Sequence, residues 1–168
     1  HSVRREKKME KQQLIDSLSH IKTFSKEASD EYEKKLHTLI SEVNQKIESR
    51  SDINELVGKN NIDMMRDNHT NHARFILSML KSFDSEIMVE TVIWVFKAYQ
   101  SHGFHSLYWA AQLNAWVEVM KENLDENNFT SVDEENFSEF SYLISDNNLI
   151  FQFSSKISSN STISIYSL

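Results

Sequence analysis

Four histidines are the residues of this chain best suited to hold a metal ion or a haem: His69, His72, His102 and His105. Neutral imidazole is a ligand for zinc, iron, copper and nickel, and helical bundles often host such sites on facing helices. The chain contains no Cys, which excludes thiolate ligands, Cys nucleophiles and disulfides. The paired Glu-x-x-His, His-Glu-x-x-His and Gly-x-Ser-x-Gly motifs are all missing. The sequence therefore predicts no enzyme, and it leaves a transition metal or haem as the cofactor hypothesis.

The first histidine pair is predicted to face the interior of a helix over residues 62–82. An apolar stripe runs through this segment in steps of three and four residues, and the two histidines complete it: Met65, His69, His72, Ile76, Met79 and Phe83. This spacing places all six side chains on one side of an α-helix. We therefore expect His69 and His72 to point inward.

The second pair, His102 and His105, lies in a turn that follows a helix predicted over 86–101. Short connections make neighbouring helices antiparallel, so His69 and His102 are expected at similar heights in a helical hairpin. Four imidazoles would then gather at one end of the bundle. The alternative is that each histidine is a core or boundary residue that hydrogen-bonds a carbonyl or a carboxylate, and both interpretations stay open.

Aromatic side chains are concentrated around the same turn. A pocket for a flat, apolar ligand would be lined by Tyr99, Phe104, Tyr108, Trp109 and Trp116. Trp94 belongs to the same group, and a helix over 107–124 carries the last three of the pocket residues. The alternative is that these rings are packed core.

The segments on either side differ from this aromatic region. Residues 2–50 are highly charged with a thin apolar stripe, which predicts a helix of about 45 residues and about 65 Å. Such a helix is too long for a small domain to bury, so we expect it to project or to pair with a second copy as a coiled coil. Three runs near the other end, 139–145, 149–157 and 162–168, favour strands or a poorly ordered tail.

These elements predict an all-α fold, an antiparallel helical bundle with a long N-terminal helix and a short C-terminal β-rich or disordered extension. The expected divisions are a dimerisation and signalling helix over 1–58, a three-helix core over 59–128 and a meander or tail over 129–168. At 168 residues, the chain is long enough to bury a core.

Charge and hydropathy exclude two classes of partner. The formal net charge of −7 disfavours nucleic-acid binding through phosphate neutralisation. No apolar run approaches the roughly 20 residues of a membrane-spanning helix. No signal-peptide pattern occurs, so a cytoplasmic location is the default expectation.

One segment resembles a known family. Lys97-Ala98-Tyr99-Gln100-Ser101-His102-Gly103-Phe104, followed by Ser106-Leu107-Tyr108-Trp109 and Leu113, is similar to one segment of bacterial sensor globins and of the haem-free globin-like domains of stressosome sensor proteins. The resemblance covers about 30 residues. Tyr99 stands where the haem-ligating histidine of sensor globins would lie, so the resemblance favours the haem-free type. It implies a sensory or regulatory domain in signal transduction, a homodimer with a protein partner in its pathway.

Overall fold

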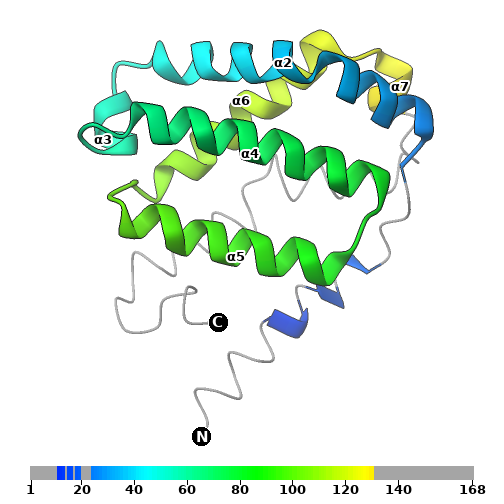
Figure 1. Ribbon diagram of the computed structural model, residues 1–168, viewed down its shortest axis with the longest axis horizontal. Helices are drawn as coiled ribbons and strands as arrows, with labels where there is room; N and C mark the ends of the chain where they lie inside the picture. The colour runs from blue at the N-terminus through cyan, green and yellow to red at the C-terminus, as the bar shows by residue number, and fades with distance from the viewer. Residues whose placement is uncertain (1–10, 14, 17, 20–23, 131–168) are drawn as a thin grey trace, which may run out of the picture.

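The computed structural model describes residues 11–13, 15, 16, 18, 19 and 24–130, and every regular element in them is helical (Figure 1). The labelled helices are α2 (Lys26–Glu48), α3 (Ile53–Val57), α4 (Ile62–Lys81), α5 (Ser85–Ser101), α6 (Leu107–Asn123) and α7 (Glu126–Thr130). The all-α prediction is confirmed for this part of the chain. The predicted strands between 139 and 168 lie outside the described residues. None of the described helices is both long and apolar enough to cross a membrane.

The helices α4, α5 and α6 begin and end within one residue of the predicted bounds. The bounds were predictable because the residues that cap these helices lie next to them in the sequence. The Asp84 side chain accepts a hydrogen bond of 2.9 Å from the Ile87 amide and starts α5. The Nδ1 of His105 accepts one of 3.1 Å from the Leu107 amide at the start of α6. In both cases the side chain accepts a hydrogen bond from a backbone amide of the first helical turn, which has no acceptor within the helix.

The main core lies where α2 packs against α4 and α6. In Figure 1, α2, α4 and α5 lie one below another, and α6 crosses behind them. The α2 side chains in this core are almost completely buried: Tyr32, Leu39, Val43 and Ile47. Helix α2 is therefore the central packing element of the bundle.

The N-terminal region corrects the prediction of one long helix. Residues 24 and 25 are not helical, and the Ser25 hydroxyl accepts a hydrogen bond of 3.2 Å from the Ala28 amide at the start of α2. Helix α2 has 23 residues, about half of the expected length. Its apolar stripe is buried inside its own chain, which is why it is not free to form the expected coiled coil.

A second, smaller core lies beside the first. Leu18 and Phe24, which precede α2, pack with Val89 of α5 and with Leu113 and Val117 of α6. Lys11 also forms a 2.5 Å ion pair with Glu90 of α5. The described residues before α2 therefore fold back over α5 and α6.

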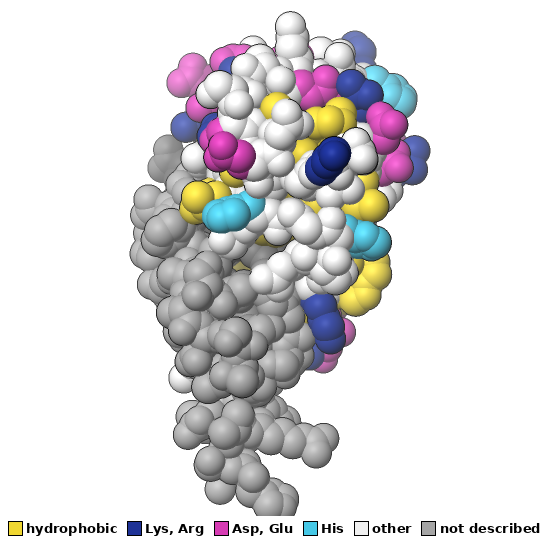
Figure 2. All heavy atoms as spheres, turned by 90° about the vertical axis from the view of Figure 1, so that its left-hand side faces the viewer, with side chains coloured by type: hydrophobic (Ala, Val, Ile, Leu, Met, Phe, Trp, Pro, Cys, Tyr) yellow, Lys and Arg dark blue, Asp and Glu magenta, His cyan; other side chains and the backbone are white. Residues whose placement is uncertain are grey.

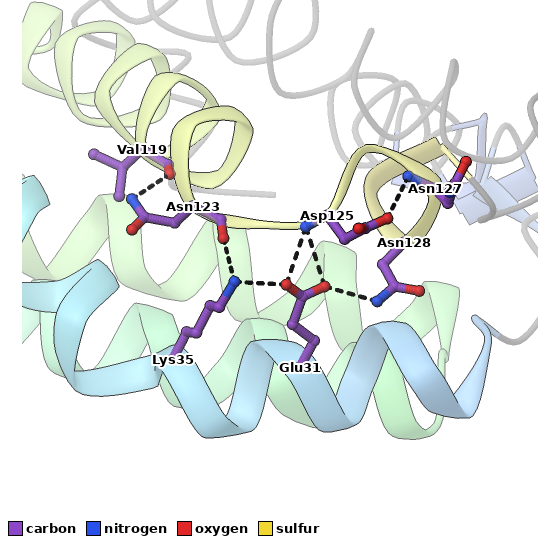
Figure 3. A network of polar contacts seen from close by, with 7 residues as sticks. All are labelled: Glu31, Lys35, Val119, Asn123, Asp125, Asn127 and Asn128. Carbon is purple, nitrogen blue, oxygen red and sulfur yellow. Dashed lines mark hydrogen bonds and ion pairs between the residues drawn. The ribbon is translucent and has the colours of Figure 1, made fainter.

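The short helix α7 is held against α2 by one carboxylate (Figure 3). The oxygens of Glu31 accept hydrogen bonds from the Lys35 ammonium at 2.6 Å, the Asp125 amide at 3.0 Å and the Asn128 side-chain amide at 2.7 Å. Lys35 also donates to the carbonyl oxygen of Asn123, the last residue of α6. The Glu31 side chain therefore fixes the α6–α7 corner onto α2.

The opposite end of the bundle is closed by two turns in contact. The Asn61 side-chain amide donates to the Val57 carbonyl oxygen at 2.8 Å and to the His102 carbonyl oxygen at 2.7 Å. The His105 amide donates to the Leu56 carbonyl oxygen at 2.8 Å. The turn between α5 and α6 is thereby fastened to the connection between α3 and α4.

Candidate functional site

The polar core cluster is a set of uncharged side chains between α2, α4 and α6. Its members are Asn44 of α2, Asn68, His69 and His72 of α4, and Tyr108 and Gln112 of α6. His69, Tyr108 and Gln112 are fully buried and Asn68 is buried, whereas Asn44 and His72 are half-buried. The inward orientation predicted for the first histidine pair is confirmed, most completely at His69.

His69 is held at both ring nitrogens. Its Nδ1 lies 2.6 Å from the Asn44 Oδ1, and its Nε2 lies 3.0 Å from the Tyr108 hydroxyl oxygen. The Tyr108 hydroxyl donates to the Asn68 Oδ1 at 2.9 Å. The His69 and Tyr108 rings are stacked, with centroids 6.1 Å apart and an interplanar angle of 16°. A hydrogen-bonded chain therefore runs from α2 through α4 to α6.

The protonation of His69 follows from this chain. Burial, reinforced by His72, lowers the pKa of His69 to about 3, so the ring is neutral near pH 7. The Asn44 Oδ1 that faces Nδ1 is an acceptor, so Nδ1 carries the single proton of the neutral ring and donates it to Asn44. The Nε2 lone pair then faces the Tyr108 hydroxyl, which also lies within hydrogen-bonding distance of the Asn68 Oδ1.

His72 has a different arrangement. Its Nδ1 lies 2.5 Å from the Gln112 Oε1, which also accepts a 3.2 Å hydrogen bond from the Trp116 indole N–H. Because Oε1 is an acceptor, the Nδ1 of His72 carries the proton and its Nε2 carries the lone pair. Burial lowers the pKa of His72 to about 4, outweighing the hydrogen bond to Gln112, which raises it. The Gln112 Nε2 is buried and has no partner among the described residues.

The second histidine pair lies elsewhere. His102 and His105 are exposed, and both are in the turn fastened to the connection after α3. His102 is thus near Asn61, eight residues before His69, or about 12 Å along α4. The expectation that His69 and His102 lie at similar heights is therefore wrong, because α5 spans nearly the whole length of α4 and places His102 beside the start of α4. The structure brings His69 and His72 together but not all four histidines.

The hypothesis that these histidines bind a metal ion can be compared with the positions of the described side chains. No group of three or more His, Asp or Glu side chains in the described ranges is placed to share a metal ion. Figure 2 shows the end of the molecule with the α5–α6 turn, where the histidine side chains on the surface lie apart. The polar core cluster contains no carboxylate, and its imidazoles act as hydrogen-bonding groups of the core.

The aromatic residues proposed as a pocket pack against each other. Tyr99 lies edge-on to Phe104 and to Trp109, with ring centroids 5.0 and 5.9 Å apart. Phe104 and Tyr108 are 4.9 Å apart. Trp116 lies next to His72 instead, with centroids 5.5 Å apart. Such edge-to-face contacts are typical of packed aromatic cores, and a pocket for a flat ligand stays a prediction.

The sequence pattern missed two features. The amides Asn44, Asn68 and Gln112 complete the histidine contacts, but no local motif marks an amide on another helix as a partner. Trp94 was grouped with the core aromatics, yet it is 67% exposed. The spacing of the sequence did indicate this exposure. Trp94 lies four residues after Glu90 and three before Lys97, so all three share one side of the helix, and two of them are charged.

The described residues define an all-helical domain with a neutral polar core and an exposed tryptophan on α5. Comparison with known proteins finds no matching family model, no matching curated protein and no matching solved structure.

Proposed function

We propose that this chain is a non-enzymatic, helical regulatory domain that acts in signal transduction through dimeric protein–protein interaction, with α5 as its contact surface. The observation that carries this proposal is the exposure of two large apolar side chains on α5. Trp94 is 67% exposed and Ile87, seven residues earlier, is 50% exposed. Residues seven apart lie on the same side of an α-helix, so these side chains belong to one face.

Helix α5 is mostly apolar in composition, but few of its described side chains are buried. Its middle, Ile87 to Tyr99, is mostly apolar, yet among its described side chains only Val89 is buried. Tryptophan is a common anchor of protein interfaces because it contributes a large contact area. An exposed tryptophan on an apolar helix therefore favours a protein-binding role.

The polar core cluster supports the non-enzymatic part of the proposal. Its two histidines are neutral, and each is held by amide or hydroxyl groups that orient it within the core. Burial also raises the pKa of Tyr108 well above its ordinary value, with a smaller contribution from Tyr99, so the hydroxyl keeps its proton. This arrangement is suited to packing specificity and not to proton transfer near pH 7.

Self-association of the full chain tests the proposal. Sedimentation equilibrium between about 5 and 500 µM should show a monomer–dimer equilibrium, as expected for a small interface. Trp94→Ser should weaken it at least tenfold. Leu107→Ser is the matched control, because Leu107 is also 50% exposed but lies on α6. A strict monomer over this range would contradict the dimeric mode of action.

The metal or haem alternative stays a separate prediction. Metal analysis and an absorbance spectrum of protein purified without a His tag would test it.

A further inference from the structure

We infer that the partner of α5 is the α5 of a second copy, packed antiparallel about a two-fold axis between Ile93 and Trp94. This inference rests on the proposed function and names its partner and geometry. In this register, Glu90 of each copy faces Lys97 of the other. The two Trp94 side chains meet at the axis.

The exposed stripe of α5 provides the geometry. It is formed by residues in steps of three and four, all of them exposed: Ile87, Glu90, Trp94, Lys97 and Ser101. This is the spacing of a helix–helix seam, in which residues of one stripe meet the same stripe of a neighbour. The stripe therefore has the apolar Trp94 at its centre, with the acidic Glu90 before it and the basic Lys97 after it.

The charges of the stripe are self-complementary. Glu90 and Lys97 lie 3.5 residues on either side of the axis, about 5 Å along the helix, so an antiparallel copy brings them to equal heights. Both pairs form at once, as a two-fold interface requires. A parallel copy would instead place Glu90 near Glu90 and Lys97 near Lys97. The sequence order of acid, tryptophan and base thus selects the antiparallel arrangement.

Both charged groups are available for this contact. Lys97 is exposed, and none of the described residues forms an ion pair with it. The Glu90 side chain is 54% exposed, and its ion pair with Lys11 uses Oε1. None of the described residues forms an ion pair with the second carboxylate oxygen, which is therefore placed to face the Lys97 of a second copy. Since these charges are exposed, they set register and specificity more than affinity.

Charge-swapped full-length variants test the register. Glu90→Lys and Lys97→Glu should each weaken self-association at least tenfold, because each places like charges opposite one another in both pairs. An equimolar mixture of the two variants should associate like the wild type, since both pairs are then complementary. The double variant E90K/K97E should also recover. Sedimentation equilibrium measures all four, and circular dichroism checks that each variant is folded.

Two controls separate the pairing from other effects. Lys11→Ala removes the same intrachain ion pair that Glu90→Lys removes, and it should associate like the wild type. Zero-length carbodiimide crosslinking of mixed ¹⁴N- and ¹⁵N-labelled chains should give a Glu90–Lys97 product that joins labelled and unlabelled copies.

The possible failures are distinguishable. If the wild type dimerises and Trp94→Ser weakens it, but the mixed variants do not recover, the register is wrong and the proposed function stands. Because the buried Trp109 and Trp116 also emit, the contribution of Trp94 is taken as the difference between the wild-type and Trp94→Ser spectra. If this contribution is already blue-shifted in a monomer and does not change with concentration, residues of the same chain cover α5. That result would overturn the pairing. A wild type that stays monomeric would contradict both the pairing and the dimeric function.

Discussion

Gly58 and Gly103 lie in direct contact, and a Cβ atom on Gly58 would be only 3.0 Å from the Gly103 carbonyl oxygen. These are the only two glycines of the chain. Both have positive φ, +82° and +95°, a conformation that other residues rarely adopt. The two turns that close this end of the bundle therefore meet backbone to backbone, beside the Asn61 side chain that is hydrogen-bonded to both.

Gly58→Ala should destabilise the fold more than Gly103→Ala. Both substitutions introduce strain at positive φ, which costs about 1 kcal/mol. At Gly58 the new methyl group also presses on a backbone carbonyl, whereas at Gly103 the nearest atom is 3.9 Å away, an ordinary contact. We expect a loss of about 2–3 kcal/mol for Gly58→Ala and about 1 kcal/mol for Gly103→Ala in urea unfolding. Equal losses would show that the contact is relieved by movement of the turn.

Tyr108→Phe should be costly because it leaves two buried groups without a partner. The hydroxyl lies 2.9 Å from the Asn68 Oδ1 and 3.0 Å from the His69 Nε2. Its removal should lower the free energy of unfolding by about 2–3 kcal/mol. Tyr32→Phe is the matched control, since the fully buried Tyr32 hydroxyl donates only to the Ala73 carbonyl, which lies within helix α4. Its cost should be about 1 kcal/mol. A smaller loss at Tyr108 would mean that the core repacks around the missing hydroxyl.

His69 and His72 of the polar core cluster should make the fold less stable as the pH falls from about 6.5 toward 4. Burial holds the folded-state pKa of His69 at about 3 and that of His72 at about 4, below the ordinary value of 6.5. The unfolded chain therefore binds more protons in this window, so stability is complete above pH 6.5 and is lost on acidification. At pH 5 the loss is about 2 kcal/mol per histidine.

Urea unfolding between pH 7.5 and 4.5 measures this loss. The matched variant is His72→Gln, which should reduce the slope between pH 6.5 and 5 by about half. His102→Gln is the control, because His102 is exposed. A wild-type stability that stays constant down to pH 5 would contradict the lowered pKa of both rings.

Glu31→Ala should release α7. The hydrogen bonds from Lys35, Asn128 and the Asp125 amide hold the pKa of Glu31 below its ordinary value, although burial acts in the opposite direction. Loss of the carboxylate should cost about 1–2 kcal/mol and should increase amide exchange at Asp125. Glu33→Ala removes a more exposed ion pair with Lys81 and should cost less than about 1 kcal/mol. Unchanged exchange at Asp125 in Glu31→Ala would show that the backbone alone holds this corner.

Local signals in the sequence predicted most of the helices. The stripe from Met65 to Met79 and the cap at Asp84 are set by neighbouring residues, and both appear as expected. The break before Lys26 was missed because the apolar stripe continues through Phe24, although the chain changes direction there. Periodicity reports which face is apolar, and it does not report whether the backbone stays straight.

The candidate site was only half predictable for a related reason. The inward direction of His69 follows from its place in the stripe, but its partners Asn44 and Tyr108 lie 25 and 39 residues away in sequence. Such contacts depend on which helices pack together and at what height. The exposure of Trp94, in contrast, agrees with its place on one stripe with Glu90 and Lys97, although the apolar composition of α5 favoured burial.

The polar core cluster contains no carboxylate, and this affects how the stability of the fold should depend on ionic strength. The buried polar side chains among the described residues are Ser29, Asn68, His69 and Gln112, none of them charged near neutral pH. The charged groups of the described residues therefore lie where dissolved ions reach them. Since the net charge of the chain is −7, added salt should stabilise the folded state by screening its self-repulsion. The hydrogen bonds inside the bundle should be indifferent to ionic strength.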